Sequence, residues 1–188
     1  MLETRRLLLK KHTLENVEKM NRWSNDPILL YYDDDIPEDD ELVPVESTKR
    51  YIEKIMDSDD DSIIRLGIHK KENNSLIGFC MIAFIDDYNK SCKMGVTIGE
   101  KDEWGNGYGK EIVSELIRYC FEELNINRIG VEIYSFNERS IKLFENLGFV
   151  KEGVIRELVY KKGKFEDEYI YGLLRREWKK TAGRSRPA

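Results

Sequence analysis

The chain has 188 residues, of which 40% are hydrophobic and 11% aromatic, enough to fill the core of one domain. Its formal net charge of −5 argues against sequence-independent nucleic-acid binding, because such binding requires a basic surface. No apolar run approaches the roughly 20 residues that cross a bilayer, and the N-terminus lacks the apolar region of a secretory signal. We therefore expect a cytoplasmic single domain over residues 1–178, without membrane or nucleic-acid partners, and a basic flexible tail over 179–188.

The cysteines and histidines do not form a metal-ligand pattern. Cys80, Cys92 and Cys120 are odd in number and lack C-x-x-C spacing, so they predict reduced, mostly buried thiols. His12 and His69 are far apart in sequence and have no neighbouring ligands. We expect no metal site.

The first third of the chain predicts one strand and two helices. Residues 5–11 predict the strand, and Thr13 is a candidate N-cap for a helix with apolar residues at helical spacing through Trp23. The Asp26-Pro27 pair predicts the end of that helix. A second helix is expected to begin at Glu46 or Ser47.

The remainder predicts strands alternating with two further helices. Residues 62–70, 75–85 and 92–99 are β-rich runs separated by turn-forming stretches, so we expect three neighbouring antiparallel strands. Apolar residues in 108–124 form a stripe typical of a long amphipathic helix. A strand over 128–136 precedes a helix capped by Asn137 and ended by Gly148, and Lys162-Gly163 predicts a closing hairpin turn. The order predicts an α/β fold whose mixed sheet carries helices on both faces.

Three glycines stand at the mouth of the long helix, within the segment TIGEKDEWGNGYGKE over residues 97–111. Backbone N–H groups and the positive end of a helix dipole there favour a phosphate group. A dinucleotide-binding fingerprint would require glycine in place of Lys110, and a Walker motif would require it in place of Trp104. A tight turn without a ligand is the alternative interpretation.

A second segment, NERSIKLFENLGF over residues 137–149, follows the next strand. Together the two segments resemble the GNAT acetyltransferases. The loop form WGNGYG, the opening LETRRLLLK and the phrase RWSNDP are similar to the branch that contains ribosomal-protein-alanine and spermidine acetyltransferases. The resemblance implies the GNAT fold of the acyl-CoA N-acyltransferases, an α/β fold with a mixed, mostly antiparallel sheet. It also implies that acetyl-CoA is the co-substrate and that no metal takes part.

The resemblance also assigns coenzyme A contacts to three segments. A splayed strand would pair with the pantetheine amides as an added strand does, the glycine loop would hold the pyrophosphate, and the second segment would line the pantetheine arm. Trp104 is expected to pack, and Asn137 has a plain N-cap as its alternative role. The implied residues are Thr97, Ile98, Gly99, Trp104, Gly105, Asn106, Gly107, Tyr108, Gly109, Lys110, Asn137, Ser140 and Phe144.

The family's mechanism is direct attack of a neutral amine on the thioester, which requires a proton acceptor. The usual acid of the family is a tyrosine at the position of Phe144, so the catalytic residues stay unassigned. Tyr134, Tyr169 and Tyr171 are alternatives for the acid, although strand aromatics are typical of a core. Candidate bases are Asp33 to Asp35, Asp86, Asp87, Glu100, Glu132 and Glu168.

An acidic run over residues 33–41 predicts the acceptor. In the family this region borders the acceptor site, so Asp33, Asp34 and Asp35 are candidate contacts for a cationic amine. A polyamine such as spermidine is the leading acceptor, with a protein N-terminus or a non-catalytic acyl-CoA-binding role as alternatives. A solvated acidic loop is the plain alternative, and homo-oligomerisation is left open.

Overall fold

A computed structural model describes residues 1–32 and 42–178. The expected tail over 179–188 and the acidic run over 33–41 lie outside the described residues. The chain divides into two compact units: unit 1 contains residues 1–81 and 96–108, and unit 2 contains 82–95 and 109–188. The expectation of a single domain stays a prediction.

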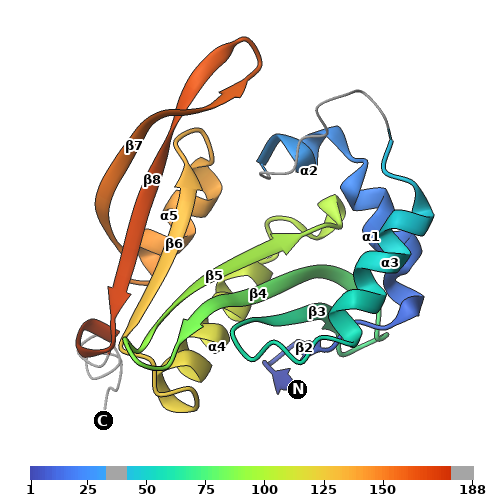
Figure 1. The fold of residues 1–188 in the computed structure, drawn as a ribbon, viewed down its shortest axis with the longest axis horizontal. Helices are drawn as coiled ribbons and strands as arrows, with labels where there is room; N and C mark the ends of the chain where they lie inside the picture. Colours follow the sequence, from blue (N-terminus) through green and yellow to red (C-terminus); the bar gives the residue numbers. More distant parts are fainter. Residues whose placement is uncertain (33–41, 179–188) are drawn as a thin grey trace. The chain divides into compact units, whose positions relative to one another are not determined.

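The strands form an eight-stranded sheet in the order β1-β2-β3-β4-β5-β6-β8-β7 (Figure 1). β5 pairs with β6 in parallel, whereas β1 with β2, β2 with β3, β6 with β8 and β7 with β8 are antiparallel. The predicted mixed, mostly antiparallel sheet is therefore confirmed. β3, β4 and β5 are neighbours in the order, as their spacing in the sequence indicated.

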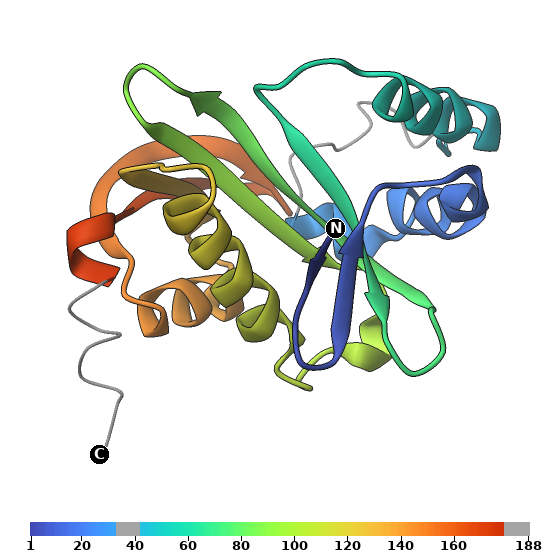
Figure 2. The ribbon, with the colours of Figure 1, turned by 90° about the horizontal axis from the view of Figure 1, so that it is seen from below.

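Unit 1 begins with a small antiparallel arrangement of β1 (Leu2–Glu3), β2 (Leu7–Lys10) and β3 (Ile64–Lys70), seen beside the N-terminus in Figure 2. β4 (Leu76–Asp86) and β5 (Ser91–Ile98) follow, and each runs from one unit into the other. The strand expected over residues 5–11 is thus shorter, and a two-residue strand precedes it.

Among residues 1–32 and 42–63, the helical segments of unit 1 are the 3₁₀ turn η1 (Leu14–Asn16), α1 (Val17–Ser24), α2 (Pro27–Tyr32) and α3 (Val45–Met56). The expected end of the first helix near Asp26 is confirmed, but α2 was missed. The Asp26 carboxylate accepts hydrogen bonds from the N–H groups of Ile28 at 2.9 Å and Leu29 at 3.3 Å. Asp26 and Pro27 therefore begin a helix as well as ending one, since proline suits the first helical position.

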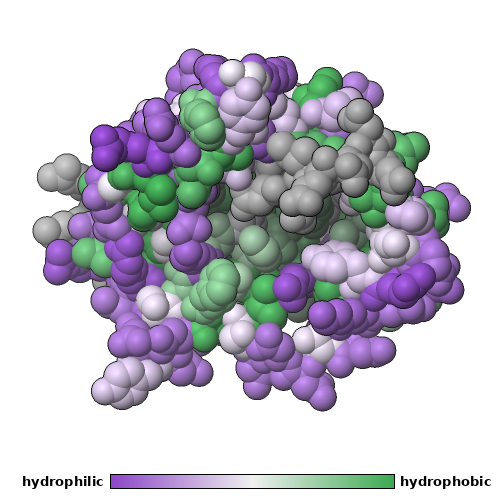
Figure 3. All heavy atoms as spheres, turned by 45° about the horizontal axis from the view of Figure 1, so that its top comes forward, coloured by the Kyte–Doolittle hydropathy of each residue, from purple (hydrophilic) through white to green (hydrophobic). Residues whose placement is uncertain are grey.

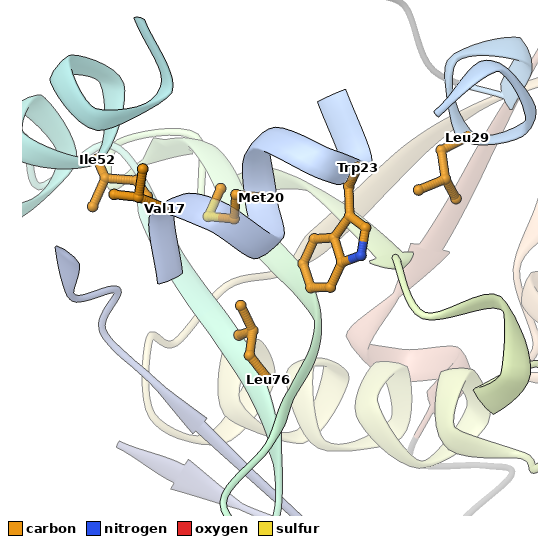
Figure 4. Close-up of a cluster of buried hydrophobic side chains, with 6 residues drawn as sticks. All are labelled: Val17, Met20, Trp23, Leu29, Ile52 and Leu76. Carbon is orange, nitrogen blue, oxygen red and sulfur yellow. The ribbon is translucent and has the colours of Figure 1, made fainter. Parts of the chain in front are cut away.

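Apolar side chains from four elements form the cluster shown in Figure 4. Met20 and Trp23 of α1 lie on the side of the helix that faces Leu76 of β4, whereas Val17 lies beside Ile52 of α3. Phe79 and Trp104 are partly exposed and pack against the cluster. Burying one such side chain contributes roughly 1.5–3 kcal/mol, so the cluster holds the short helices against the strands. Its buried members are Val17, Met20, Trp23, Leu29, Ile52 and Leu76.

The helix α4 (Tyr108–Glu122) belongs to unit 2 except for its first residue. Unit 2 also contains β6 (Arg128–Tyr134), α5 (Glu138–Asn146) and the long hairpin of β7 (Val150–Lys161) and β8 (Lys164–Leu174). The predicted apolar stripe of α4 is buried from Ile112 to Phe121. Gly148 ends α5 with φ +93°, and Lys162 and Gly163 turn the hairpin with φ +50° and +84°. Each of these turns was predicted from the sequence.

Polar side chains cover much of the face seen in Figure 3, in keeping with the 36% of residues that are charged. Among the described residues, no helix has the length and apolar character needed to cross a membrane. The three cysteines are buried and free, as expected, with the sulfurs of Cys92 and Cys120 3.8 Å apart.

Candidate functional site

The glycine loop follows β5 and the 3₁₀ turn η2 (Lys101–Glu103). Gly105 and Gly107 have φ +82° and +77°, the left-handed conformation that side-chain-bearing residues rarely adopt. Among the described residues, a Cβ atom added at Gly105 would meet nothing within 4 Å, and one at Gly107 would meet the Arg6 Nη2 at 3.8 Å. These two glycines therefore provide a turn whose face is open to a ligand.

The loop leads directly into α4, whose 15 residues make a full N-terminal dipole. The first-turn N–H groups of such a helix have no partner within the helix and favour an anion. Gly109 has a different role, because a Cβ added there would lie 3.3 Å from Leu143 Cδ2 of α5. The third glycine allows close packing of two helices within unit 2, while the exposed Lys110 follows it on the first turn of α4.

Side chains on both sides of the loop fix its conformation. The Glu103 carboxylate accepts hydrogen bonds from Lys70 Nζ at 2.8 Å and from Asn106 Nδ2 at 3.2 Å. The hydrogen bond to Glu103, and to a smaller extent the one to Glu72, raise the pKa of Lys70 above its usual range. The loop is therefore tied to β3 by a charge-assisted contact, although its glycines remain exposed.

Trp104 joins the loop to the end of β5. Its indole Nε1 donates to the Ile98 carbonyl at 2.7 Å, and its ring packs against the apolar cluster of unit 1. The predicted packing role is thus confirmed. The indole occupies one lone pair of the Ile98 carbonyl, so a ligand pairing with this strand end would share that oxygen or use other backbone groups.

The last residues of β5 lie tightly between β4 and α1. The N–H groups of Gly99 and Glu100 both donate to the Ile77 carbonyl, at 2.9 and 3.1 Å. A Cβ at Gly99 would overlap the Trp23 indole. Thr97, Ile98 and Gly99 therefore hold a fixed backbone path into the loop.

The second predicted segment lies in unit 2 and begins α5. The Asn137 Oδ1 accepts from the Ser140 N–H at 3.2 Å, so the N-cap role is confirmed. This bond uses the oxygen of the amide group and leaves the two Nδ2 hydrogens as donors for another partner. Asn137 and Ser140 are half-buried, whereas Phe144 is 4% exposed and packs edge-on against Phe149 at 5.1 Å.

The parallel pairing of β5 with β6 has three registered pairs, Ser91 with Arg128, Cys92 with Ile129 and Lys93 with Gly130. Both strands continue beyond them, and β6 stays paired with β8 through Tyr134. The predicted site residues from Thr97 to Tyr108 thus lie in unit 1, whereas unit 2 contains Gly109, Lys110, Asn137, Ser140 and Phe144.

Two of the candidate proton-transfer groups are already engaged in local structure. Burial raises the pKa of Tyr171 to about 12, and the hydrogen bond that its hydroxyl donates to Glu145 at 2.9 Å is the second cause of this rise. Its 1% exposure supports the interpretation of a core residue. Asp86 accepts the N–H groups of Tyr88 and Asn89, and hydrogen bonding by Asn89 lowers its pKa. Both groups are therefore poorly suited to proton transfer near neutral pH.

Two other candidate carboxylates lie in ion pairs. Glu100 contacts Arg22 at 2.9 Å and Lys19 at 3.5 Å, and Glu132 contacts Lys93 at 2.6 Å. Among the tyrosines, the ring centre of Tyr169 lies 3.0 Å from the Lys151 Nζ. The catalytic base and acid stay unassigned, and Asp33, Asp34 and Asp35 lie outside the described residues.

Comparison with known proteins gives the family. Residues 6–150 match the model of the acetyltransferase (GNAT) domain. The chain is 35% identical over 178 residues to the uncharacterized N-acetyltransferase p20 of Bacillus licheniformis, covering 94% of this chain and 97% of that protein. It is also 35% identical over 106 residues to the putative ribosomal N-acetyltransferase YdaF of Bacillus subtilis, covering 56% and 57% of the two chains.

A solved structure shares the fold. The spermidine N-acetyltransferase of Vibrio cholerae, in complex with CoA and spermine, matches with a TM-score of 0.80 at 19% identity, over 92% of this chain and 97% of that one. The chain belongs to the GNAT acetyltransferase family. It is accordingly an N-acetyltransferase, an acyltransferase of the fold that binds acetyl-CoA.

Proposed function

We propose that this enzyme transfers the acetyl group of acetyl-CoA to a primary amine, and that its acceptor is a polyamine. The observation that carries the cofactor half of the proposal is the open face of Gly105 and Gly107 at the start of α4. Both glycines adopt positive φ, and a Cβ on either would make no close contact with residues 1–32 or 42–178, so tight packing within these ranges does not require them. Positive φ favours glycine at both positions, and the face that they leave open gives a pyrophosphate room to approach the loop N–H groups.

The remaining cofactor contacts are those that membership of the GNAT family implies. Thr97, Ile98 and Gly99 would pair with the pantetheine amides and polarise the thioester carbonyl. The Asn137 amide, whose oxygen caps α5, would donate from Nδ2 to the arm beside Ser140.

In the reaction the amine first loses a proton to a carboxylate or to a water chain that ends in one. The neutral nitrogen attacks the thioester carbon and, now cationic, releases its second proton to water; the tetrahedral oxyanion then collapses, and the carbon–sulfur bond breaks as the amide forms. Coenzyme A leaves as a thiolate. A thiol pKa of about 8.5 makes that thiolate a tolerable leaving group near neutral pH, so Phe144 does not preclude turnover.

A polyamine acceptor is supported by charge. The chain carries a formal charge of −5, and its residues 33–41 read DDDIPEDDE, a run without a basic residue. Such a segment attracts a flexible polycation more strongly than a neutral peptide. The fold neighbour from Vibrio cholerae was solved in complex with spermine. A protein N-terminus is the second acceptor, favoured by the similarity to a putative ribosomal N-acetyltransferase.

The acceptor is tested by replacing Asp33, Asp34 and Asp35 with Asn and measuring KM for spermidine. The matched control replaces Asp57, Asp59 and Asp61 with Asn, which changes the net charge equally at another acidic run. We expect KM to rise in the first variant alone and the difference to shrink as salt screens charges beyond about 10 Å at 0.1 M. Equal KM values in the two variants would contradict the acceptor site, and turnover of peptides without polyamines would select the N-terminal alternative.

A further inference from the structure

Glu103 is an acidic residue beside a loop that is proposed to bind phosphate. It is the last residue of η2 and precedes Gly105 by two positions. A carboxylate at such a place repels a phosphate group unless a neighbouring cation compensates its charge. That cation comes from β3, because Lys70 Nζ donates to Glu103 Oε1 at 2.8 Å. The two side chains are 16% and 20% exposed, so solvent screens this pair less than it screens a fully exposed one.

The same carboxylate reaches into the loop itself. Its second oxygen, Oε2, accepts a hydrogen bond from Asn106 Nδ2 at 3.2 Å. Asn106 stands between Gly105 and Gly107, both of which have left-handed backbone. The contact therefore closes a short ring of side chains and backbone over residues 103–106. The two oxygens of Glu103 thus connect β3 with the glycine loop, and all of these residues belong to unit 1.

A loop with two glycines needs such a connection. Glycine populates left- and right-handed backbone conformations about equally, so ordering it costs more conformational entropy than ordering other residues. If only a fraction of the molecules has the loop conformation that binds, the apparent affinity for the ligand falls by that fraction. A side chain that holds this conformation before the ligand arrives therefore raises the affinity without contacting the ligand.

We propose that Glu103 is a positioning residue for coenzyme A: it holds Asn106 and the glycines on either side in the conformation that receives phosphate, and Lys70 anchors it and compensates its charge. The proposal rests on the proposed binding of coenzyme A at the glycine loop. Glu103 lies outside the glycine motif, and its cation is 33 residues away in sequence. Neither residue was identified as part of the site from the sequence.

The first test compares the Kd of coenzyme A, measured by calorimetry, in wild type, Glu103→Ala, Glu103→Gln and Glu72→Ala. Glu72 is the matched control, because its carboxylate also contacts Lys70 Nζ, at 2.7 Å, and its side chain is 67% exposed. We expect Glu103→Ala to raise Kd about 5- to 10-fold, within the range for one lost hydrogen bond. Glu103→Gln and Glu72→Ala should each weaken binding less than about twofold, since the glutamine amide oxygen still accepts from Asn106.

The second test isolates the charge of Glu103. Lys70→Gln leaves this carboxylate without its cation, so it should also raise Kd relative to wild type. The rise should shrink at higher salt, because dissolved ions screen the repulsion between carboxylate and phosphate. Adding Glu103→Gln to Lys70→Gln should cancel the rise. Adding Glu72→Gln instead changes the net charge equally and should cancel less of it.

The proposal is overturned by any of three results. The first is an equal Kd in Glu103→Ala and Glu72→Ala, with a lower Tm for Glu103→Ala, which would leave Glu103 a purely structural residue. The second is a loss of affinity in Glu103→Gln as large as that in Glu103→Ala. The third is a rise in Lys70→Gln that Glu103→Gln does not cancel. A wild-type protein that does not bind coenzyme A would instead refute the proposed function itself, before any variant is compared.

Discussion

Gly107→Ala is expected to separate ligand binding from folding. Gly107 has φ +77°, and a non-glycine residue in the left-handed region costs roughly 1–2 kcal/mol. The added methyl group would meet only Arg6 Nη2, at 3.8 Å, among the described residues, so no steric term adds to that cost. For a domain of this size the penalty corresponds to a fall in Tm of about 2–8 °C.

Gly163→Ala is the matched control. Gly163 has φ +84° and belongs to the turn between β7 and β8. In the part of the chain that the structure describes, nothing lies within 4 Å of its added Cβ. The two variants should therefore lose similar stability, which thermal or urea unfolding measures. Their difference isolates what the methyl group does to a ligand at the loop.

The methyl group that Gly107→Ala adds would occupy the face through which phosphate oxygens approach. Losing one charge-assisted hydrogen bond costs about 1.5–3 kcal/mol, or roughly a 10- to 100-fold rise in Kd. Calorimetric titration with coenzyme A should show that rise for Gly107→Ala and a Kd near the wild-type value for Gly163→Ala. Equal Kd values in the two variants would refute the reasoning that places a phosphate at Gly107.

Three further outcomes are expected. Gly99→Ala should lower the free energy of unfolding by about 1–3 kcal/mol, because its methyl group would overlap the Trp23 indole; an unchanged Tm would contradict that packing. Phe144→Tyr should change kcat less than about tenfold, since the thiolate leaves without a phenol, whereas a rise of about 10² or more would show that a missing acid limits the wild type. Burial lowers the pKa of His12 and His69, so the unfolded chain takes up protons near pH 6.5 before the folded one does. Stability measured by urea unfolding should therefore fall as pH drops below that value, by up to about 1.4 kcal/mol per pH unit for each histidine, and replacing both with Gln should flatten the slope.

Local signals predicted most elements because they act within a few residues. The stripe of α4, the Asn137 cap and the left-handed Gly148 each depend on neighbours in sequence, and the structure has all three. α2 was missed because Asp26-Pro27 has two interpretations: the pair ends one helix and begins another. A capping carboxylate before a proline is the signal for a new helix, but the sequence alone does not choose between the two interpretations.

Contacts between distant segments were not predictable in the same way. Nothing in the segment around Lys70 indicates the glycine loop, because their proximity depends on how β3 and the loop are arranged in unit 1. The need for glycine at position 99 was not predictable either. A Cβ there would overlap the Trp23 indole, and this overlap arises only because Trp23 packs across Gly99. A pair of opposite charges, Lys70 and Glu103, would become visible only by comparing related sequences.

The most direct test of the central claim is release of free thiol from acetyl-CoA with a panel of amines: spermidine, spermine, peptides with free N-termini and single amino acids. Thiol release is expected to require an added amine, to equal the acetylated product mole for mole, and to be fastest with a polyamine. A wild-type protein that binds coenzyme A yet releases no thiol with any member of the panel would contradict it.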